Sequence, residues 1–369
     1  MAKPPYMVKA LSLLVLLVVG AAPAPRVHAV SVPRHAVKGV PWRAIVAVSR
    51  PATATLRATG PTTLTVRLRP TKRHGRYQST LRFPFAGSWR ISVRAGKRTT
   101  RLGSVSVDVP RDPLVKDPIT IAAEPQGSLV VGQLRAGPTI LRIAHARARK
   151  LADGPGVFHV YVAGGKTYAA GRDGVVYRLD GPSLTPLTPP LDASAVAVDA
   201  AGNLYFTVYV GWVKKVAPNG RVSVVAGNGT EGYSGDGGLA TAAQLFHPHS
   251  LAIGRDGALY VADTENRHIR RVDLATGRIT SFGGDVGITV SLAVGPDGSI
   301  YSADVQRDGT GGGVTRTTPA GATTRILTSR TVNGVAVAPD GAVYVNQWEP
   351  KRIQLLNPAT GKLVPVVRG

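Results

Sequence analysis

Residues 251–263 read LAIGRDGALYVAD, which is a short apolar segment, an Asp-Gly turn and a second apolar segment that contains a tyrosine. The pattern recurs at 196–205 (VAVDAAGNLY), 292–301 (LAVGPDGSIY) and 335–344 (VAVAPDGAVY), with weaker copies nearer the N-terminus. Glycine suits such turns because it adopts positive φ angles without steric cost. The six turn glycines are Gly127, Gly165, Gly202, Gly257, Gly298 and Gly341, spaced by 38, 37, 55, 41 and 43 residues.

Each unit has room for four strands. After the tyrosine, residues 268–273 (HIRRVD) form a basic amphipathic segment, and residues 278–282 follow a further turn at Thr276-Gly277. One small sheet cannot bury both of its faces, so the units must stack against one another. Six such sheets around an axis make a six-bladed β-propeller, which we predict for residues 113–369. A linear β-solenoid is the alternative, although its repeats are usually much shorter.

The longest spacing contains a distinctive segment. Residues 226–245 read AGNGTEGYSGDGGLATAAQL, and together with 248–253 and 259–273 they closely resemble an NHL repeat. The resemblance is close over 226–284 and weaker over the remaining units. It implies a propeller that usually serves as a rigid binding platform, although some relatives are sensors and a few similar propellers are enzymes.

The N-terminus has the features of an export signal. Lys3 and Lys9 precede the apolar residues 10–22, and Val27-His28-Ala29 provides a cleavage site, so residues 1–29 are predicted to be a Sec-type signal peptide. The apolar run is shorter than the about 20 residues that a membrane span needs. We therefore expect a bacterial protein that is secreted or associated with the cell envelope, without a transmembrane span. An uncleaved anchor is the alternative.

Residues 30–112 are predicted to form a separate β-sandwich. Segments 62–69, 89–94 and 105–109 alternate polar and apolar residues and are separated by turn residues. Gly75-Arg76-Tyr77 and the stretch 83–93 (FPFAGSWRISV) resemble bacterial immunoglobulin-like modules of the YtkA-like kind. The expected architecture is thus all-β, with an immunoglobulin-like sandwich before the NHL-type propeller.

Most of the net charge of +24 belongs to this first module. Residues 30–112 contain 17 Lys/Arg and two acidic residues, which gives +15, whereas residues 113–369 carry +6. An exported protein rarely meets nucleic acid, so an anionic envelope polymer is the more available partner. The alternative is a compositional bias with solvated charges. The arginines at polar strand positions, predicted to contact the polymer, are Arg67, Arg69, Arg82, Arg90 and Arg94.

Few residues indicate catalysis. The chain has no cysteine, no Gly-x-Ser-x-Gly elbow and no His-Glu-x-x-His motif. Gly227–Gly232 fits a dinucleotide-binding pattern, but strands rather than a helix are expected after it. His247-Pro248-His249 is the strongest candidate. Alignment of the units by their turns places these residues opposite His249: Ile119, Val157, Ser194, Val290 and Asn333.

Histidine does not recur in that ring, so neither a central metal nor another cofactor is predicted. The predicted ligand-binding residues at the channel mouth are His247, His249, Ser194 and Asn333, with no catalytic residue assigned. The predicted function is an exported, monomeric, non-enzymatic binding or sensor scaffold at the cell envelope, with an envelope polymer or a protein as ligand. The alternative is a propeller hydrolase or lyase, lactonase-like or streptogramin-lyase-like, with its site at the channel mouth.

Overall fold

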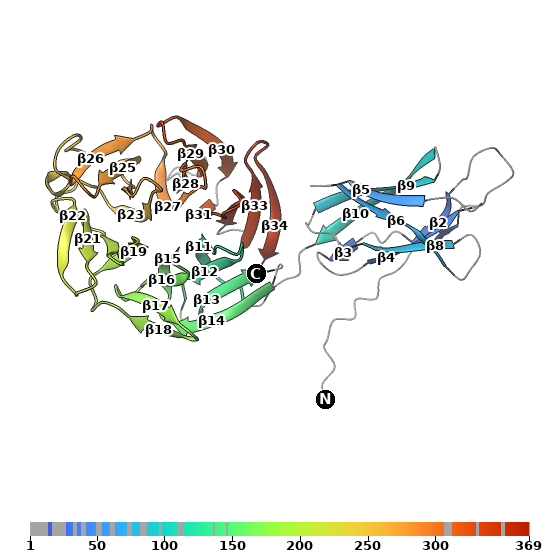
Figure 1. Ribbon diagram of the computed structural model, residues 1–369, viewed down its shortest axis with the longest axis horizontal. Coiled ribbons are helices and arrows are strands. Elements are labelled where there is room, and N and C mark those ends of the chain that lie inside the picture. The colour runs from blue at the N-terminus through green and yellow to red at the C-terminus, as the bar shows by residue number, and fades with distance from the viewer. Residues whose placement is uncertain are drawn as a thin grey trace. The chain divides into compact units, whose positions relative to one another are not determined.

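A computed structural model of the chain is shown in Figure 1. The chain divides into two compact units, the first formed by residues 1–110 and 364–366 and the second by residues 111–363 and 367–369. The structure describes residues 14–16, 27–31, 35–37, 42–48, 54–59, 63–71, 76–81, 87–95, 98–108, 112, 114–135, 137–144, 147–305, 312–329, 332–347 and 351–368.

The described residues confirm an all-β protein. Their regular elements are β-strands, apart from one short 3-10 helix at Ala240–Ala242. Over the same residues, no helix has the length and apolar character to cross a membrane.

Within the described part of the second unit, the strands form six four-stranded antiparallel sheets. Each sheet consists of four strands that follow one another directly in sequence. In sheets one to three they are β11 (Pro118–Ala123), β12 (Leu129–Gln133), β13 (Gly137–Ala144), β14 (Arg147–Gly154), β15 (Val157–Ala163), β16 (Lys166–Gly171), β17 (Val176–Asp180), β18 (Ser183–Pro186), β19 (Ala193–Val198), β20 (Leu204–Val208), β21 (Trp212–Val216) and β22 (Val222–Ala226).

Sheets four to six continue the same order. Their strands are β23 (Pro248–Ile253), β24 (Leu259–Asp263), β25 (His268–Asp273), β26 (Arg278–Phe282), β27 (Ile288–Val294), β28 (Ile300–Val305), β29 (Gly312–Thr317), β30 (Thr323–Ser329), β31 (Val332–Val337), β32 (Val343–Gln347), β33 (Arg352–Asn357) and β34 (Lys362–Arg368). The first strand of each sheet contacts the first strand of the next, and β31 contacts β11, so the sheets surround a common axis (Figure 1).

The repeated turns show why the motif recurs. The Asp256 carboxylate accepts the backbone N–H of Ala258 at 3.2 Å and the hydroxyl of Tyr260 at 3.1 Å, and Gly257 has a φ of +75°. The Asp199 and Asp340 carboxylates accept backbone N–H groups in their own turns in the same way. The repeated aspartates therefore stabilise the turns, as aspartate does in many turns.

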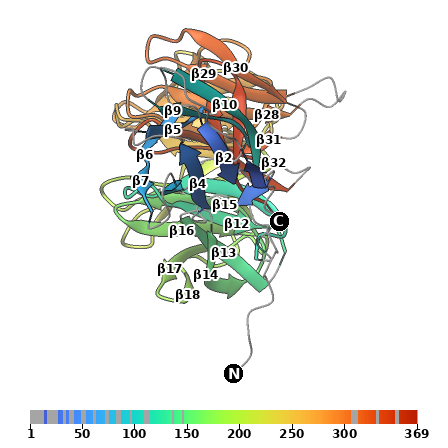
Figure 2. The ribbon, with the colours of Figure 1, turned by 90° about the vertical axis from the view of Figure 1, so that its right-hand side faces the viewer.

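The first unit contains two five-stranded sheets (Figure 2). In spatial order, one consists of β1 (Leu14–Leu16), β2 (Val27–Ser31), β4 (Trp42–Val48), β8 (Arg76–Leu81) and β7 (Arg69–Pro70). The other consists of β3 (His35–Val37), β10 (Arg98–Asp108), β9 (Gly87–Ala95), β5 (Ala54–Thr59) and β6 (Thr63–Arg67). The strand β1 lies within the predicted signal peptide, which stays a prediction.

Candidate functional site

The first strand of each propeller sheet carries a β-bulge at an equivalent position. A bulge leaves one residue unpaired with the neighbouring strand and redirects its side chain. The six bulged residues, all half-buried, are Ile119, Phe158, Ser194, His249, Val290 and Asn333. The alignment by turns thus matches the structural equivalence except in sheet two, where Phe158 rather than Val157 occupies the position.

Three of the four predicted channel-mouth residues are members of this ring, and each has its own surroundings. The Oγ of Ser194 lies 2.8 Å from Oγ1 of Thr207 on the neighbouring strand. The Oδ1 of Asn333 accepts a hydrogen bond of 2.5 Å from Nδ2 of Asn346. The Nδ1 atom of His249 is buried without a hydrogen-bond partner, and burial lowers the pKa of this imidazole. His249 is therefore a neutral imidazole near pH 7.

The fourth residue, His247, precedes β23 and has an unusual backbone conformation. Its φ of +49° lies in the left-handed region that non-glycine residues seldom adopt. Its ring stacks on Tyr209 with a centroid separation of 3.9 Å, and its Nε2 lies 3.0 Å from Oε1 of Glu231. The Nδ1 atom is buried and has no hydrogen-bond partner. These contacts join His247 to the segment that precedes it and to the turn after β20.

A further buried histidine, His159, lies outside the predicted channel-mouth set and also has a lowered pKa. His159 is buried, and burial, followed by the nearby charge of His249, lowers its pKa to about 4. Its Nδ1 accepts the backbone N–H of Val196 at 3.5 Å, so Nε2 carries the proton and faces Ser250 Oγ at 3.4 Å. The same Ser250 oxygen accepts the N–H of Leu292 at 3.0 Å. His159 thereby links sheets two, three and four, and the Ser250 hydroxyl extends the link to sheet five.

The position of His159 in the repeat explains this role. It follows the bulge, as do Thr120, Ser250 and Ser291 in their sheets. The Oγ1 of Thr120 accepts the N–H of Val160 at 3.2 Å, and the Oγ of Ser291 accepts that of Val335 at 3.2 Å. A polar side chain at this position therefore bonds one sheet to the next. The signal was present in the sequence, one residue beyond the ring of the turn alignment for Thr120, Ser250 and Ser291, and two residues beyond Val157 for His159.

The NHL-like segment is held by a fully buried arginine. The guanidinium of Arg270 donates to Asp263 at 3.3 Å on one side and to Asp236 at 2.6 Å and the Ser234 carbonyl at 3.0 Å on the other. The ring of Tyr233 lies 4.8 Å from the guanidinium carbon. Asp236 in the NHL-like segment and Asp263 on β24 are thus both ion-paired to Arg270, which has a structural role.

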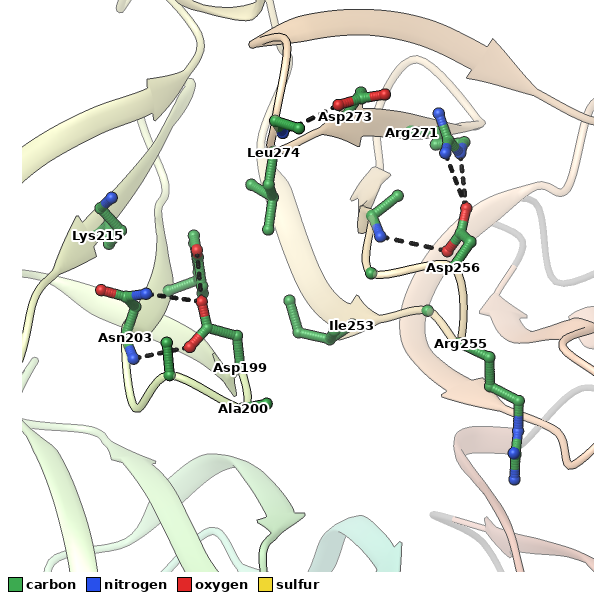
Figure 3. A pocket seen from close by; sticks show the side chains of 16 residues that line it. Asp199, Ala200, Asn203, Lys215, Ile253, Arg255, Asp256, Arg271, Asp273 and Leu274 are labelled. Atoms are coloured by element: carbon green, nitrogen blue, oxygen red, sulfur yellow. Dashed lines mark hydrogen bonds and ion pairs between the residues drawn. The ribbon is translucent and has the colours of Figure 1, made fainter.

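A groove lies at the other end of the same strands (Figure 3). Its volume is about 740 Å³, and the turns after β19 and β23 and the Leu274 segment line it. Ser194 and His249 stand at the opposite ends of β19 and β23. The predicted mouth residues therefore do not line this groove.

The carboxylates of Asp199 and Asp256 in the groove already accept hydrogen bonds from neighbouring side chains. Although burial alone would raise it, hydrogen bonds from Asn203 and Tyr205 hold the pKa of Asp199 below its usual value. Burial would also raise the pKa of Asp256, but hydrogen bonds from Arg271 at 2.9 Å, Ala258 and Tyr260 together lower it below its usual value. Both groups are ionised acceptors near pH 7, which suits binding better than proton transfer. Over the residues that the structure describes, no three His, Asp or Glu side chains are arranged to hold a metal ion.

In the first unit, the arginines lie differently from the prediction. Arg67, Arg90 and Arg94 are exposed on one sheet, whereas Arg69 belongs to β7 of the other sheet. Arg82 lies outside the described residues. The pairing of β5, β6, β9 and β10 adds the exposed Arg57 and Arg101 to the face of Arg67, Arg90 and Arg94. Which arginines share a face depends on how the strands pair, and the composition does not specify that pairing.

Comparison with known proteins bears on the second unit. A family model described as the Teneurin NHL domain matches residues 157–273. The fold and this match support an NHL-repeat β-propeller. Teneurin-1 of Mus musculus is 36% identical over 94 residues, which are 22% of this chain and 3% of that protein. The chloroplastic protein SUPPRESSOR OF QUENCHING 1 of Arabidopsis thaliana is 42% identical over 78 residues, which are 21% of this chain and 7% of that protein. The NHL match thus spans a small part of these relatives.

Similar solved structures include a structural-genomics protein of unknown function from Bacteroides thetaiotaomicron, with a TM-score of 0.51 and 14% identity over 93% of this chain and 97% of that one. A streptogramin B lyase gives a TM-score of 0.49 and 16% identity over 68% of this chain and 83% of that one. Identities this low concern the fold alone.

Proposed function

We propose that the protein is an exported, non-enzymatic binding scaffold of the bacterial cell envelope. In this proposal residues 1–29 are a signal peptide and residues 30–112 an immunoglobulin-like sandwich that contacts an anionic polymer. Residues 113–369 are a closed six-bladed NHL propeller, the platform for a ligand or a protein partner.

The observation that carries the proposal is the exposed arginine face of the first unit. Arg57, Arg67, Arg90, Arg94 and Arg101 share one side of a sheet. The other side of the same strands is apolar, with Leu56, Ile91 and Val93 fully buried. The sheet thus uses one face for the core and presents a positive field on the other, which attracts anionic partners.

The propeller contributes an exposed aromatic and apolar surface around His247. Tyr209 and Val210 are about half exposed, at 51% and 50%, and Tyr209 stacks on His247. Tyr233 and Leu239, in the segment before His247, are also exposed and lie against β25 and β26 of the same sheet. Exposed aromatic side chains of this kind are common at binding sites. We assign the partner contact of the propeller to this side.

One observation favours a hydrolase or lyase as the second candidate. His247 and His249, two residues apart, both have a buried Nδ1 without a hydrogen-bond partner. A polar group of a substrate that reached these two Nδ1 atoms would form the hydrogen bonds that they lack in the structure. In that case, replacement of His249 would abolish turnover and leave envelope binding unchanged.

The proposal is tested with the full-length mature protein and purified, protein-free envelope polymer in a sedimentation assay. At low salt the protein should co-sediment, and it should be released as salt rises. The triple variant Arg57→Ser, Arg67→Ser, Arg94→Ser should lose most of this retention. The control variant Arg147→Ser, Arg149→Ser, Arg221→Ser removes the same charge from exposed positions of the second unit and should be retained like the parent. Equal loss in the two variants, or retention indifferent to salt, would contradict the proposal.

A further inference from the structure

The five arginines of the exposed face occupy alternating positions of a regular grid. Across β6, β5, β9 and β10, one row of paired residues is Arg67, Thr55, Arg94 and Thr99. The next row is Thr65, Arg57, Ser92 and Arg101. In the third row Thr63 and Thr59 lie beside Arg90. Every arginine is therefore separated from the next one in its row by a hydroxyl residue.

The grid fixes the distances between the charges. Adjacent strands are about 4.8 Å apart, and residues two positions apart along a strand are about 6.7 Å apart. The diagonal from Arg57 to Arg94, like that from Arg57 to Arg67, is thus roughly 8 Å between Cα atoms. This Cα separation is about one Debye length at physiological salt. Salt therefore does not fully screen neighbouring guanidinium groups from one another, and both attract the same anion.

The first module offers almost no internal counter-charge to this grid. Residues 30–107 contain no Asp or Glu, and the two acids that follow are Asp108 and Asp112. The Asp112 carboxylate accepts the backbone N–H groups of Leu114 and Ala148. A multivalent anion would therefore supply charge that this module does not contain.

The residue types indicate which anion. All five cations of the grid are arginine, whose planar guanidinium donates two parallel hydrogen bonds to an oxyanion. The non-bridging oxygens of a phosphate diverge tetrahedrally, so one phosphate can accept from two arginines on a diagonal. A carboxylate has only two oxygens, both in one plane, so two arginines on a diagonal would have to share them, whereas a phosphate offers further oxygens in other directions. The intervening Thr55 and Thr65 offer hydroxyl donors along the same path.

We propose that this face binds a linear polymer of phosphate groups, whose successive phosphates follow the diagonals Arg67–Arg57–Arg94–Arg101. This rests on the proposed function, which assigns an anionic polymer to the same face. The pair of parallel hydrogen bonds that each guanidinium donates, and not net charge alone, determines the affinity. Single phosphate ions bind weakly, because affinity comes from several contacts made by one chain.

The test uses the full-length mature protein and two probes of equal chain length, inorganic polyphosphate and polyglutamate, in a titration at 150 mM salt. Polyphosphate should bind at least tenfold more tightly than polyglutamate and raise the melting temperature of the protein. The variant with all five arginines changed to lysine keeps the charge and should lose at least tenfold in polyphosphate affinity. A control variant with three exposed arginines of the second unit, Arg147, Arg149 and Arg221, changed to lysine should bind like the parent. Circular dichroism and melting verify that each variant is folded.

The outcomes separate the two proposals. Equal affinity for both polymers, or full affinity in the lysine variant, would overturn the phosphate assignment and leave anionic-polymer binding intact. Binding to neither polymer would overturn both. Preferential binding to phosphatidylglycerol vesicles over polyphosphate would overturn the linear polymer in favour of a lipid surface.

Discussion

The imidazole Nε2 of His159 and the hydroxyl of Ser250 lie 3.4 Å apart, although 91 residues separate them in the chain. They come from the first strands of the second and fourth sheets of the propeller. Both side chains are buried, so this polar contact joins two sheets that are not adjacent in the ring, and its protonation state matters for stability.

Acid should destabilise the propeller through His159. Its pKa is lowered from 6.5 to about 4 by burial and by His249, whose own pKa is also lowered by burial. Below about pH 6.5, His159 binds a proton in the unfolded chain but not in the folded chain. The free energy of unfolding therefore falls as pH drops from about 6.5 to about 4. From the His159 shift the loss should reach roughly 3 kcal/mol. Urea unfolding at pH 7 and pH 4.5 measures it.

The variant His159→Ser places there the residue type found at the equivalent position of sheets four and five. It should flatten the acid dependence, whereas His268→Gln on β25 should keep it. An unchanged pH profile in His159→Ser would show that another group is responsible.

Replacement of Arg270 should destabilise the fourth sheet strongly. Arg270→Met leaves the buried carboxylate of Asp263 without its ionic partner, a loss of about 3–5 kcal/mol for a buried pair. The adjacent Arg271→Met breaks a partly exposed pair with Asp256 and should cost about 1 kcal/mol or less. Chemical denaturation of the two variants compares them. Similar losses would mean that the Arg270 cluster adds nothing beyond surface charge.

Replacement of His249 should leave the fold intact. Because its buried Nδ1 makes no hydrogen bond, His249→Leu removes an unsatisfied polar atom and should change stability by no more than about 1 kcal/mol. Ligand engagement by the propeller should change instead. A fall in melting temperature comparable to that of Arg270→Met would identify His249 as a structural residue.

Loss of the last sheet should unfold the whole propeller. A chain that ends before Thr331 lacks β31, which contacts both β27 and β11. Two apolar sheet faces would then be exposed to water. We expect aggregation or the loss of a cooperative melting transition, measured by calorimetry and light scattering. A monomeric truncated protein that melts like the parent would contradict a closed ring.

The repeat alone was sufficient to predict the propeller strands. Residues 268–273 and 278–282, predicted as strands, are β25 and β26 with those bounds. The offset in sheet two was not predictable from the turns, because only Gly164 and Gly165 join β15 to β16, whereas residues 199–203 join β19 to β20, so counting back from the glycine gives Val157 instead of Phe158. The arginine face was predicted in part, since Arg57 joins it and Arg69 leaves it through strand pairing that alternation alone does not specify. The groove escaped prediction because its lining residues are the repeated turn residues, which were interpreted as structural.

The hydrogen bond from Asn346 to the carbonyl of Pro118 joins two residues that are 228 positions apart. The last sheet therefore meets the first only after nearly the whole chain is available, whereas each sheet by itself is built from neighbouring segments. Contacts of such sequence separation form slowly because a long loop must close first. We expect a folding intermediate with local sheets formed and the seam between β31 and β11 open, and this open edge is where the protein is most vulnerable to aggregation during folding.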